Sequence, residues 1–231
     1  MSLDSLSTNL SRDNPRVIVI KDHDSQSPRE GRQSQTPAPA AEQTLAVFPL
    51  PLFILPGGVQ RLKIFEQRYI NMVAQASRQG GFVIARYDKQ FAFNVPNWGT
   101  KVEIVDFHTS EDGLLVIDVK AMHLVSLDGF YQQEDGLLMA KSRYRAHWPD
   151  DSPLTRSGEL GQALQELFAQ HPQLAELYPQ PQFKQLDWVC ARFLEILPLS
   201  LNEKEKFILP GSFRQAKSFL DTLILGQDKI N

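Results

Sequence analysis

The feature that most constrains this chain is a change in the spacing of its apolar residues near residue 150. Between Thr44 and Tyr144, apolar positions alternate or fall in short runs separated by turn residues, which is typical of β-strands. From Pro153 onward they recur every three or four residues, which is typical of amphipathic helices. The sequence therefore predicts an α+β protein in which a strand-rich half precedes a helical half.

The strand-rich half is predicted to form a small barrel or sandwich. Residues 100–107 alternate with a period of two, and a Glu-Asp-Gly turn at 111–113 separates them from a second apolar run at 114–119. Further Asp-Gly pairs follow at similar spacing. Regularly spaced short strands favour a closed or layered sheet over alternating strand–helix units. One inserted helix is expected over 66–79, where a Gly-Gly pair ends it.

The helical half is predicted to form a bundle that buries its apolar stripes against itself or against the barrel. Pro198 ends one of these helices and Gly226 closes the last. The expected helices are one from a Ser152 N-cap to about Gln170, one with a stripe at Phe183, Leu186, Cys190, Phe193 and Leu197, one begun by a Ser200–Glu203 capping box, and one over Phe213–Ile224.

Aromatic residues delimit the folded part of the chain, because all 22 of them lie between Phe48 and Phe219. A segment with so little apolar surface does not offset the entropy of ordering it. We therefore predict a disordered N-terminal tail over 1–43, a barrel subdomain over 44–148 and a helical-bundle subdomain over 149–231. An alternative for the tail is that Val17–Ile20 adds to a sheet edge as a strand.

Charge and cysteine content restrict the compartment and the partners. The 24 basic and 27 acidic residues give a net charge of −3, which argues against a strongly phosphate-binding surface. The single cysteine, Cys190, cannot form an internal disulfide. No apolar run is long enough for export or for crossing a bilayer. We expect a cytoplasmic protein with no membrane partner, and the sequence leaves its oligomeric state open.

No motif for catalysis or for cofactor binding is present in the sequence. Phosphate-binding loops, dinucleotide fingerprints, nucleophile elbows and zinc-protease motifs are all missing. Cys190 lies in the middle of an apolar stripe, where a cysteine acts as a small core residue. The five histidines are scattered and show no metal-ligand spacing. We predict that the protein is not an enzyme, with no catalytic residues, no metal and no cofactor.

One basic and aromatic segment leaves a nucleic-acid role open. Arg143 and Arg145 flank Tyr144, and His147 and Trp148 follow. Such a pattern can bind single-stranded nucleic acid by stacking and phosphate contact. The net charge favours the simpler interpretation, a strand with one charged face and one apolar face.

The most informative stretch is Phe48–Tyr69, which reads as a strand, a Pro-Gly-Gly turn, a second strand and the start of a helix. It closely resembles the opening of the Lon substrate-binding (Lon protease N-terminal) domain family, approximately P-L-F-P-L-x-x-x-L-F-P-G-x-x-x-P-L-x-I-F-E-x-R-Y. The resemblance extends from about Leu45 to Leu225. It is broken at Lys120–Ser126, which lacks the family's G-x-x-R-F-x-[IV] pattern, so no role of that turn is carried over.

The resemblance implies a PUA-like β-barrel followed by a helical bundle, in a stand-alone member without ATPase or protease modules. It implies binding of polypeptides rather than catalysis, and an adaptor role in protein quality control would fit. We expect Phe53, Leu55, Val59 and Arg61, beside the Pro-Gly-Gly turn, to line the recognition groove. The alternative function is an RNA-binding PUA-like domain, with nucleic acid the less favoured partner.

Overall fold

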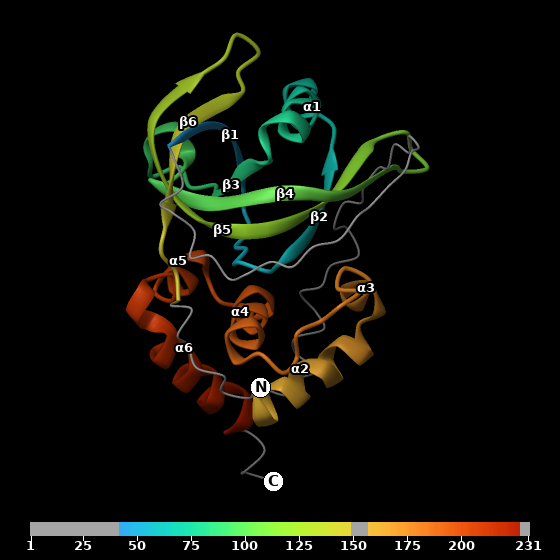
Figure 1. The fold of residues 1–231 in the computed structure, drawn as a ribbon, viewed down its shortest axis with the longest axis vertical. Helices are drawn as coiled ribbons and strands as arrows, with labels where there is room; N and C mark the ends of the chain where they lie inside the picture. The colour runs from blue at the N-terminus through green and yellow to red at the C-terminus, as the bar shows by residue number, and fades with distance from the viewer. Residues whose placement is uncertain (1–41, 149–156, 227–231) are drawn as a thin grey trace, which may run out of the picture.

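The computed structural model describes residues 42–148 and 157–226. Along the chain, a six-stranded sheet with one inserted helix is followed by a group of helices (Figure 1). The strands are β1 (Gln43–Leu50), β2 (Val59–Ile64), β3 (Phe82–Arg86), β4 (Trp98–Thr109), β5 (Leu115–Gln132) and β6 (Leu138–Arg145). The helices are α1 (Gln67–Gln79), α2 (Gly158–Gln170), α3 (Pro172–Ala175), α4 (Leu186–Ile196), α5 (Leu201–Glu205) and α6 (Phe213–Leu220). Short turns are η2 (Ala92–Asn94), η3 (Pro210–Ser212) and the π-helical η4 (Asp221–Leu225).

The six strands form one mixed sheet that nearly closes into a ring. Its order is β2-β5-β4-β3-β1-β6, and β6 also pairs with β5. Closure is possible because β5 is 18 residues long: β2 pairs with its first half and β6 with its second half. Pairing of β3 with β4 stops at Val102. Beyond Val102, β2, β5 and β4 therefore form a three-stranded extension of the ring.

The predicted hairpin over 100–119 is confirmed as β4 and β5. Its turn contains Gly113 at φ 79°, and the Gly113 N–H donates to the Ser110 carbonyl at 2.8 Å. Two shifts of register interrupt the alternation, leaving Met122 of β5 and Val105 of β4 without partners in the ladder. Such bulges increase local twist, so the expected period of two is not maintained along the whole hairpin.

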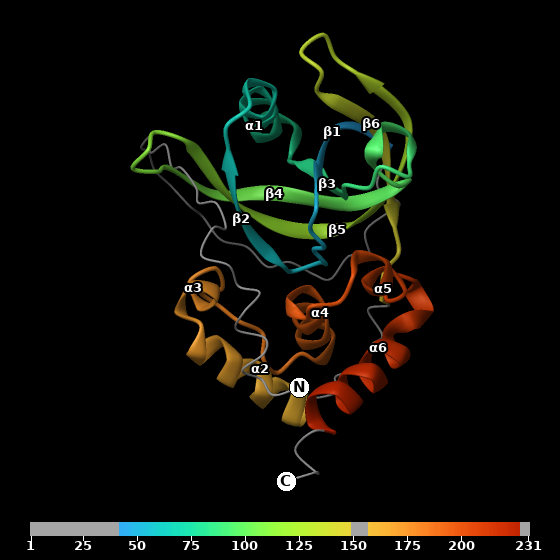
Figure 2. The ribbon, with the colours of Figure 1, turned by 180° about the vertical axis from the view of Figure 1, so that it is seen from behind.

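Helix α1 and helices α2–α6 lie on opposite sides of the β4–β5 layer in both views (Figures 1 and 2). Helix α1 buries Met72, Val73 and Ala76 in a core shared with β1–β6. A separate core joins Leu124 and Trp98 of the sheet to α2, α4 and α6. The sheet and the helices therefore share a continuous apolar contact.

The helical periodicities are largely confirmed, with differences at the helix starts. The Ser200–Glu203 capping box is present, and α4 ends before Pro198. The proposed Ser152 N-cap lies outside the described residues, and α2 begins only at Gly158, whose φ of +54° is not helical. Phe183 precedes α4 rather than lying on it. The limits proposed for the tail and the two subdomains stay a prediction.

Candidate functional site

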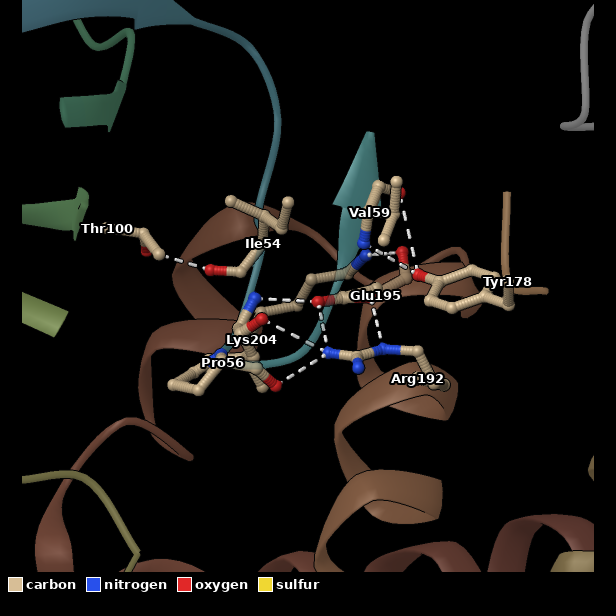
Figure 3. A network of polar contacts seen from close by, with 9 residues as sticks. Ile54, Pro56, Val59, Thr100, Tyr178, Arg192, Glu195 and Lys204 are labelled. Carbon is tan, nitrogen blue, oxygen red and sulfur yellow. Dashed lines mark hydrogen bonds and ion pairs between the residues drawn. The ribbon is translucent and has the colours of Figure 1, made fainter. Parts of the chain in front are cut away.

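A buried ion pair on α4 holds the loop that connects β1 to β2 (Figure 3). Only 1% of Arg192 is exposed, and its guanidinium contacts the Glu195 carboxylate through Nε at 2.7 Å and Nη2 at 2.8 Å. The same Nη2 donates to the carbonyls of Leu55 at 3.1 Å and Pro56 at 3.2 Å. The Leu55 N–H donates to Glu195 Oε1 at 2.6 Å. One side-chain pair therefore satisfies three backbone groups of the loop.

Lys204 at the end of α5 completes this buried network. Its Nζ donates to the backbone carbonyl of Glu195 at 2.8 Å and lies 5.9 Å from the centre of the Phe53 ring. Burial lowers the pKa of Lys204 to about 8. Burial also raises the pKa of Glu195, while Arg192 opposes that rise. These shifts arise because charge is removed from water at the contact between sheet and helices.

Two aromatic rings enclose the Arg192 guanidinium. Its central carbon lies 5.3 Å from the centre of the Trp188 ring and 5.9 Å from that of Tyr178. Such cation–π contacts stabilise a buried cation. The Tyr178 hydroxyl accepts the Val59 N–H at 2.9 Å, and burial raises the pKa of Tyr178 to about 12. The start of β2 is thereby fixed to the loop before α4.

The two glycines of the Pro-Gly-Gly turn are required by close packing against this network. A Cβ on Gly58 would lie 2.5 Å from Glu195 Oε1 and 2.9 Å from Ile54 Cγ1. Gly57 has φ +77°, and a Cβ there would lie 3.1 Å from Trp188 Cδ1. The turn of the family-like stretch is therefore a docking element between the sheet and α4.

Most polar groups of the network are bonded within the protein, although the buried Arg192 Nη1 has no hydrogen-bond partner among the described residues. The Glu195 carboxylate is shared by Arg192 and the Leu55 N–H, the Lys204 ammonium is held by the Glu195 carbonyl, and the Tyr178 hydroxyl by Val59. Cys190 is buried in the helical core as predicted, where burial raises its pKa to about 12 and keeps it a thiol. Within residues 42–148 and 157–226, no group of three or more His, Cys, Asp or Glu side chains is placed to hold a metal ion.

The four residues expected to line a groove do not share one surface. Phe53 and Leu55 are buried in the core between the sheet and the helices. Val59 is half-buried on β2. Arg61, also on β2, pairs with Asp118 of β5 through two contacts at 2.8 and 2.6 Å, and this hydrogen bonding raises the pKa of Arg61. Their role in binding stays a prediction, and in this conformation Phe53 and Leu55 are out of a partner's reach.

The sequence interpretation missed the residues that hold the two halves together. Arg192 and Glu195 are charged residues three positions apart inside the apolar stripe of α4, and that position was the available signal. Arg86 of β3, which is also buried, lies 3.0 Å from Asp88 and donates to Asn202 of α5 at 2.7 Å. The contacts of Arg192 with the Leu55 and Pro56 carbonyls and of Arg86 with Asn202 could not be read from spacing, because these partners come from distant parts of the chain.

The outer side of β2 differs from the buried turn. Phe65, directly after the strand, is 68% exposed, the largest exposure of any large apolar side chain among the described residues. Arg61 pairs with Asp118, and Lys63 pairs with Asp112. The strand pairs with β5 on one side, and no described strand pairs with its other side.

The basic and aromatic segment near residue 144 is largely engaged within the protein. Arg143 contacts Glu42 and Asp128, and the Arg145 guanidinium lies 5.9 Å from the centre of the Trp98 ring. These contacts agree with the simpler interpretation of a strand with a charged face. The charge of Arg143 is thereby paired with two carboxylates.

Comparison with known proteins identifies the family. Residues 44–207 match the model of the ATP-dependent protease La (LON) substrate-binding domain. The chain belongs to this family. No curated protein sequence matches the chain. The match is to the Lon substrate-binding domain, which agrees with the resemblance seen in Phe48–Tyr69.

Solved structures of Lon N-terminal domains share the fold. A Lon N-terminal domain protein from Xanthomonas campestris superposes with a TM-score of 0.59 at 24% identity, covering 77% of this chain and 96% of that one. The N-terminal domain of Lon protease from the Mycobacterium avium complex gives a TM-score of 0.52 at 12% identity, covering 78% and 97%. Among the described helices, none has the length and apolar character needed to cross a membrane.

Proposed function

We propose that this Lon substrate-binding domain is a non-catalytic module that binds unfolded polypeptides, and that it acts as an adaptor in protein quality control. The observation that carries the proposal is the exposure of Phe65 at 68%, within the stretch that resembles the family. Burying a phenylalanine side chain is worth about 1.5–3 kcal/mol, so an exposed one beside an open strand is a favourable contact for an unfolded chain.

The proposal keeps Val59 and Arg61 from the expected groove, because both lie on β2, the strand that Phe65 follows. It sets aside Phe53 and Leu55 as contacts, because they stabilise the core. The nearly closed ring of strands supports the further proposal that the sheet is a PUA-like barrel. RNA binding has less support, because Arg143 and Arg145 are engaged within the protein.

Fluorescence anisotropy tests the proposal with a reduced, carboxymethylated protein as a permanently unfolded probe. We expect the full chain to bind this probe and not the same protein in its native form. Phe65→Ser is expected to weaken binding by about tenfold, equal to about 1.4 kcal/mol. Val105→Ser is the matched control, because Val105 is also exposed, at 54%, but lies on β4.

Two results would contradict the proposal. The first is that the wild-type chain fails to bind the unfolded probe. The other is binding of single-stranded RNA that weakens steeply with salt, together with indifference to the unfolded probe. The second result would favour the RNA-binding alternative.

A further inference from the structure

We infer that an unfolded polypeptide binds by adding as a strand to the free edge of β2, along Arg61–Phe65. This inference rests on the proposed function and adds to it the place and the mode of binding. Three observations carry it. The backbone groups of alternate β2 residues point away from β5, the other free edge, on β4, is interrupted by a bulge, and the side chains beside the β2 edge are paired cations and the exposed Phe65.

The backbone direction follows from the contacts of Val59. Its N–H donates to the Tyr178 hydroxyl at 2.9 Å, and its carbonyl accepts from the same hydroxyl at 3.5 Å, so both groups point away from β5. In an antiparallel pair, alternate residues face the partner strand. Arg61 and Lys63 therefore also turn their N–H and carbonyl groups outward. The Ala121 N–H, which donates to the Gly58 carbonyl at 2.8 Å, fits the same register.

These outward groups are largely without partners. The Gln60 side chain donates to the Arg61 carbonyl at 3.1 Å. For the Arg61 N–H and for both backbone groups of Lys63, the described part of the chain offers no outward partner. An exposed row of such groups is a template for another strand. No proline or bulge interrupts it between Val59 and Ile64.

The other free edge of the extension, on β4, is blunted. A bulge at Val105 breaks the ladder there, and the Phe107 N–H is taken by the Asp106 carboxylate at 2.9 Å. Bulges and side-chain caps are ways in which proteins protect sheet edges from pairing. The contrast assigns strand addition to β2.

The chemistry of the β2 edge defines its occupant as an extended, uncharged and partly apolar segment of another polypeptide. Only an extended polypeptide presents N–H and carbonyl groups with the repeat that β2 offers. The cations beside the edge are paired with carboxylates, Arg61 with Asp118 and Lys63 with Asp112, so the edge offers no unpaired cation to an acidic segment. Phe65 at the end of the edge offers contact to an apolar side chain.

Residue-resolved amide exchange of the full chain, with and without the carboxymethylated probe, tests this inference. We expect the probe to slow exchange of the Arg61 and Lys63 amides at least tenfold. The Leu62 and Ile64 amides, which face β5, are expected to be protected already and to change little. Binding of the probe without added protection at Arg61 and Lys63 overturns the inference while leaving the proposed function intact. Absence of binding overturns both.

A pair of variants gives an independent measurement. Lys63→Pro removes an outward N–H, at an edge position where proline is tolerated, and is expected to weaken probe binding at least tenfold. Lys63→Ala keeps the N–H while removing the ion pair with Asp112, and is expected to bind nearly as wild type. Equal affinities for both variants overturn the inference. Slow exchange of the Arg61 and Lys63 amides in the free protein would also overturn the inference. Protection that increases with protein concentration would indicate that a second copy occupies the edge. Protection that is lost when residues 1–41 are deleted would indicate that this segment occupies it.

Discussion

Two parts of the family-like stretch, the turn at Leu55–Gly58 and the end of β2 at Phe65, have opposite environments. At the turn, Leu55–Gly58 is enclosed by Arg192 and Glu195, and its backbone groups are bonded to buried charge. Ten residues later, Phe65 is exposed beside a strand whose outer side no described strand pairs with. A motif that reads as one unit in sequence therefore contains a structural part and a part that remains open to a partner.

This difference shows why exposure has to be known before site residues are chosen. Apolar residues near the turn are attractive as binding residues when only the sequence is known. The structure buries Phe53 and Leu55 against the helices and leaves Phe65 in water.

The first prediction concerns the ion pair that encloses the buried turn. Arg192→Met leaves Glu195 buried without its partner, and we expect the free energy of unfolding to fall by about 3–5 kcal/mol. Urea denaturation measures the change. The double variant Arg192→Met/Glu195→Leu is expected to recover part of the loss, because it removes both charges. A loss below 1 kcal/mol in the single variant would show that the network does not hold the turn.

The second prediction concerns the close approach at the turn. Gly58→Ala places a Cβ 2.5 Å from Glu195 Oε1, and we expect destabilisation of about 1–3 kcal/mol. Gly211→Ala is the control, because a Cβ there has no neighbour within 4 Å. Thermal unfolding of both variants compares them. Equal melting temperatures would contradict the tight packing of the turn.

The third prediction is a pH dependence of the free energy of unfolding that arises from His147, at the contact between the sheet and the helices. Burial lowers the pKa of His147 to about 4, so protonation favours the unfolded state and stability falls as the pH drops below about 6.5. Between pH 7 and pH 5 this group accounts for about 2 kcal/mol. We expect His147→Gln to lose that part of the pH dependence in urea denaturation. If the pH dependence of unfolding is the same in His147→Gln as in the wild type, the His147 side chain is exposed to water rather than buried.

The fourth prediction concerns the effect of the exposed Phe65 side chain on the free energy of unfolding. Phe65→Ser removes an exposed side chain, so the free energy of unfolding is expected to change by less than about 0.5 kcal/mol. Urea denaturation provides the comparison with Gly58→Ala. A loss as large as that of Gly58→Ala would mean that Phe65 is part of the fold.

Local structure could be predicted from the sequence where local chemistry decides it. The Ser200–Glu203 capping box and the Gly80 end of α1 follow from short patterns, and both are confirmed. The predicted N-cap at Ser152 lies outside the described residues, and the non-helical φ of Gly158, where the described α2 begins, could not be read from the sequence pattern. The ring closure was harder still, since it depends on β5 being long enough to pair with β2 and β6 in turn.

The candidate site was less accessible from the sequence, for a physical reason. Whether Leu55 faces water depends on where α4 packs, and spacing within the stretch does not contain that information. The Arg192–Glu195 pair contacts Leu55 across more than 130 positions. A charged pair inside an apolar helical stripe is a signal that a partner exists, but it does not say which one.

The most direct test of the central division measures stability and affinity together for Gly58→Ala and Phe65→Ser. We predict that Gly58→Ala unfolds more easily and, while folded, binds the carboxymethylated probe as wild type. Phe65→Ser is predicted to be as stable as wild type and to bind the probe about tenfold more weakly. The account is contradicted if Phe65→Ser binds the probe with wild-type affinity.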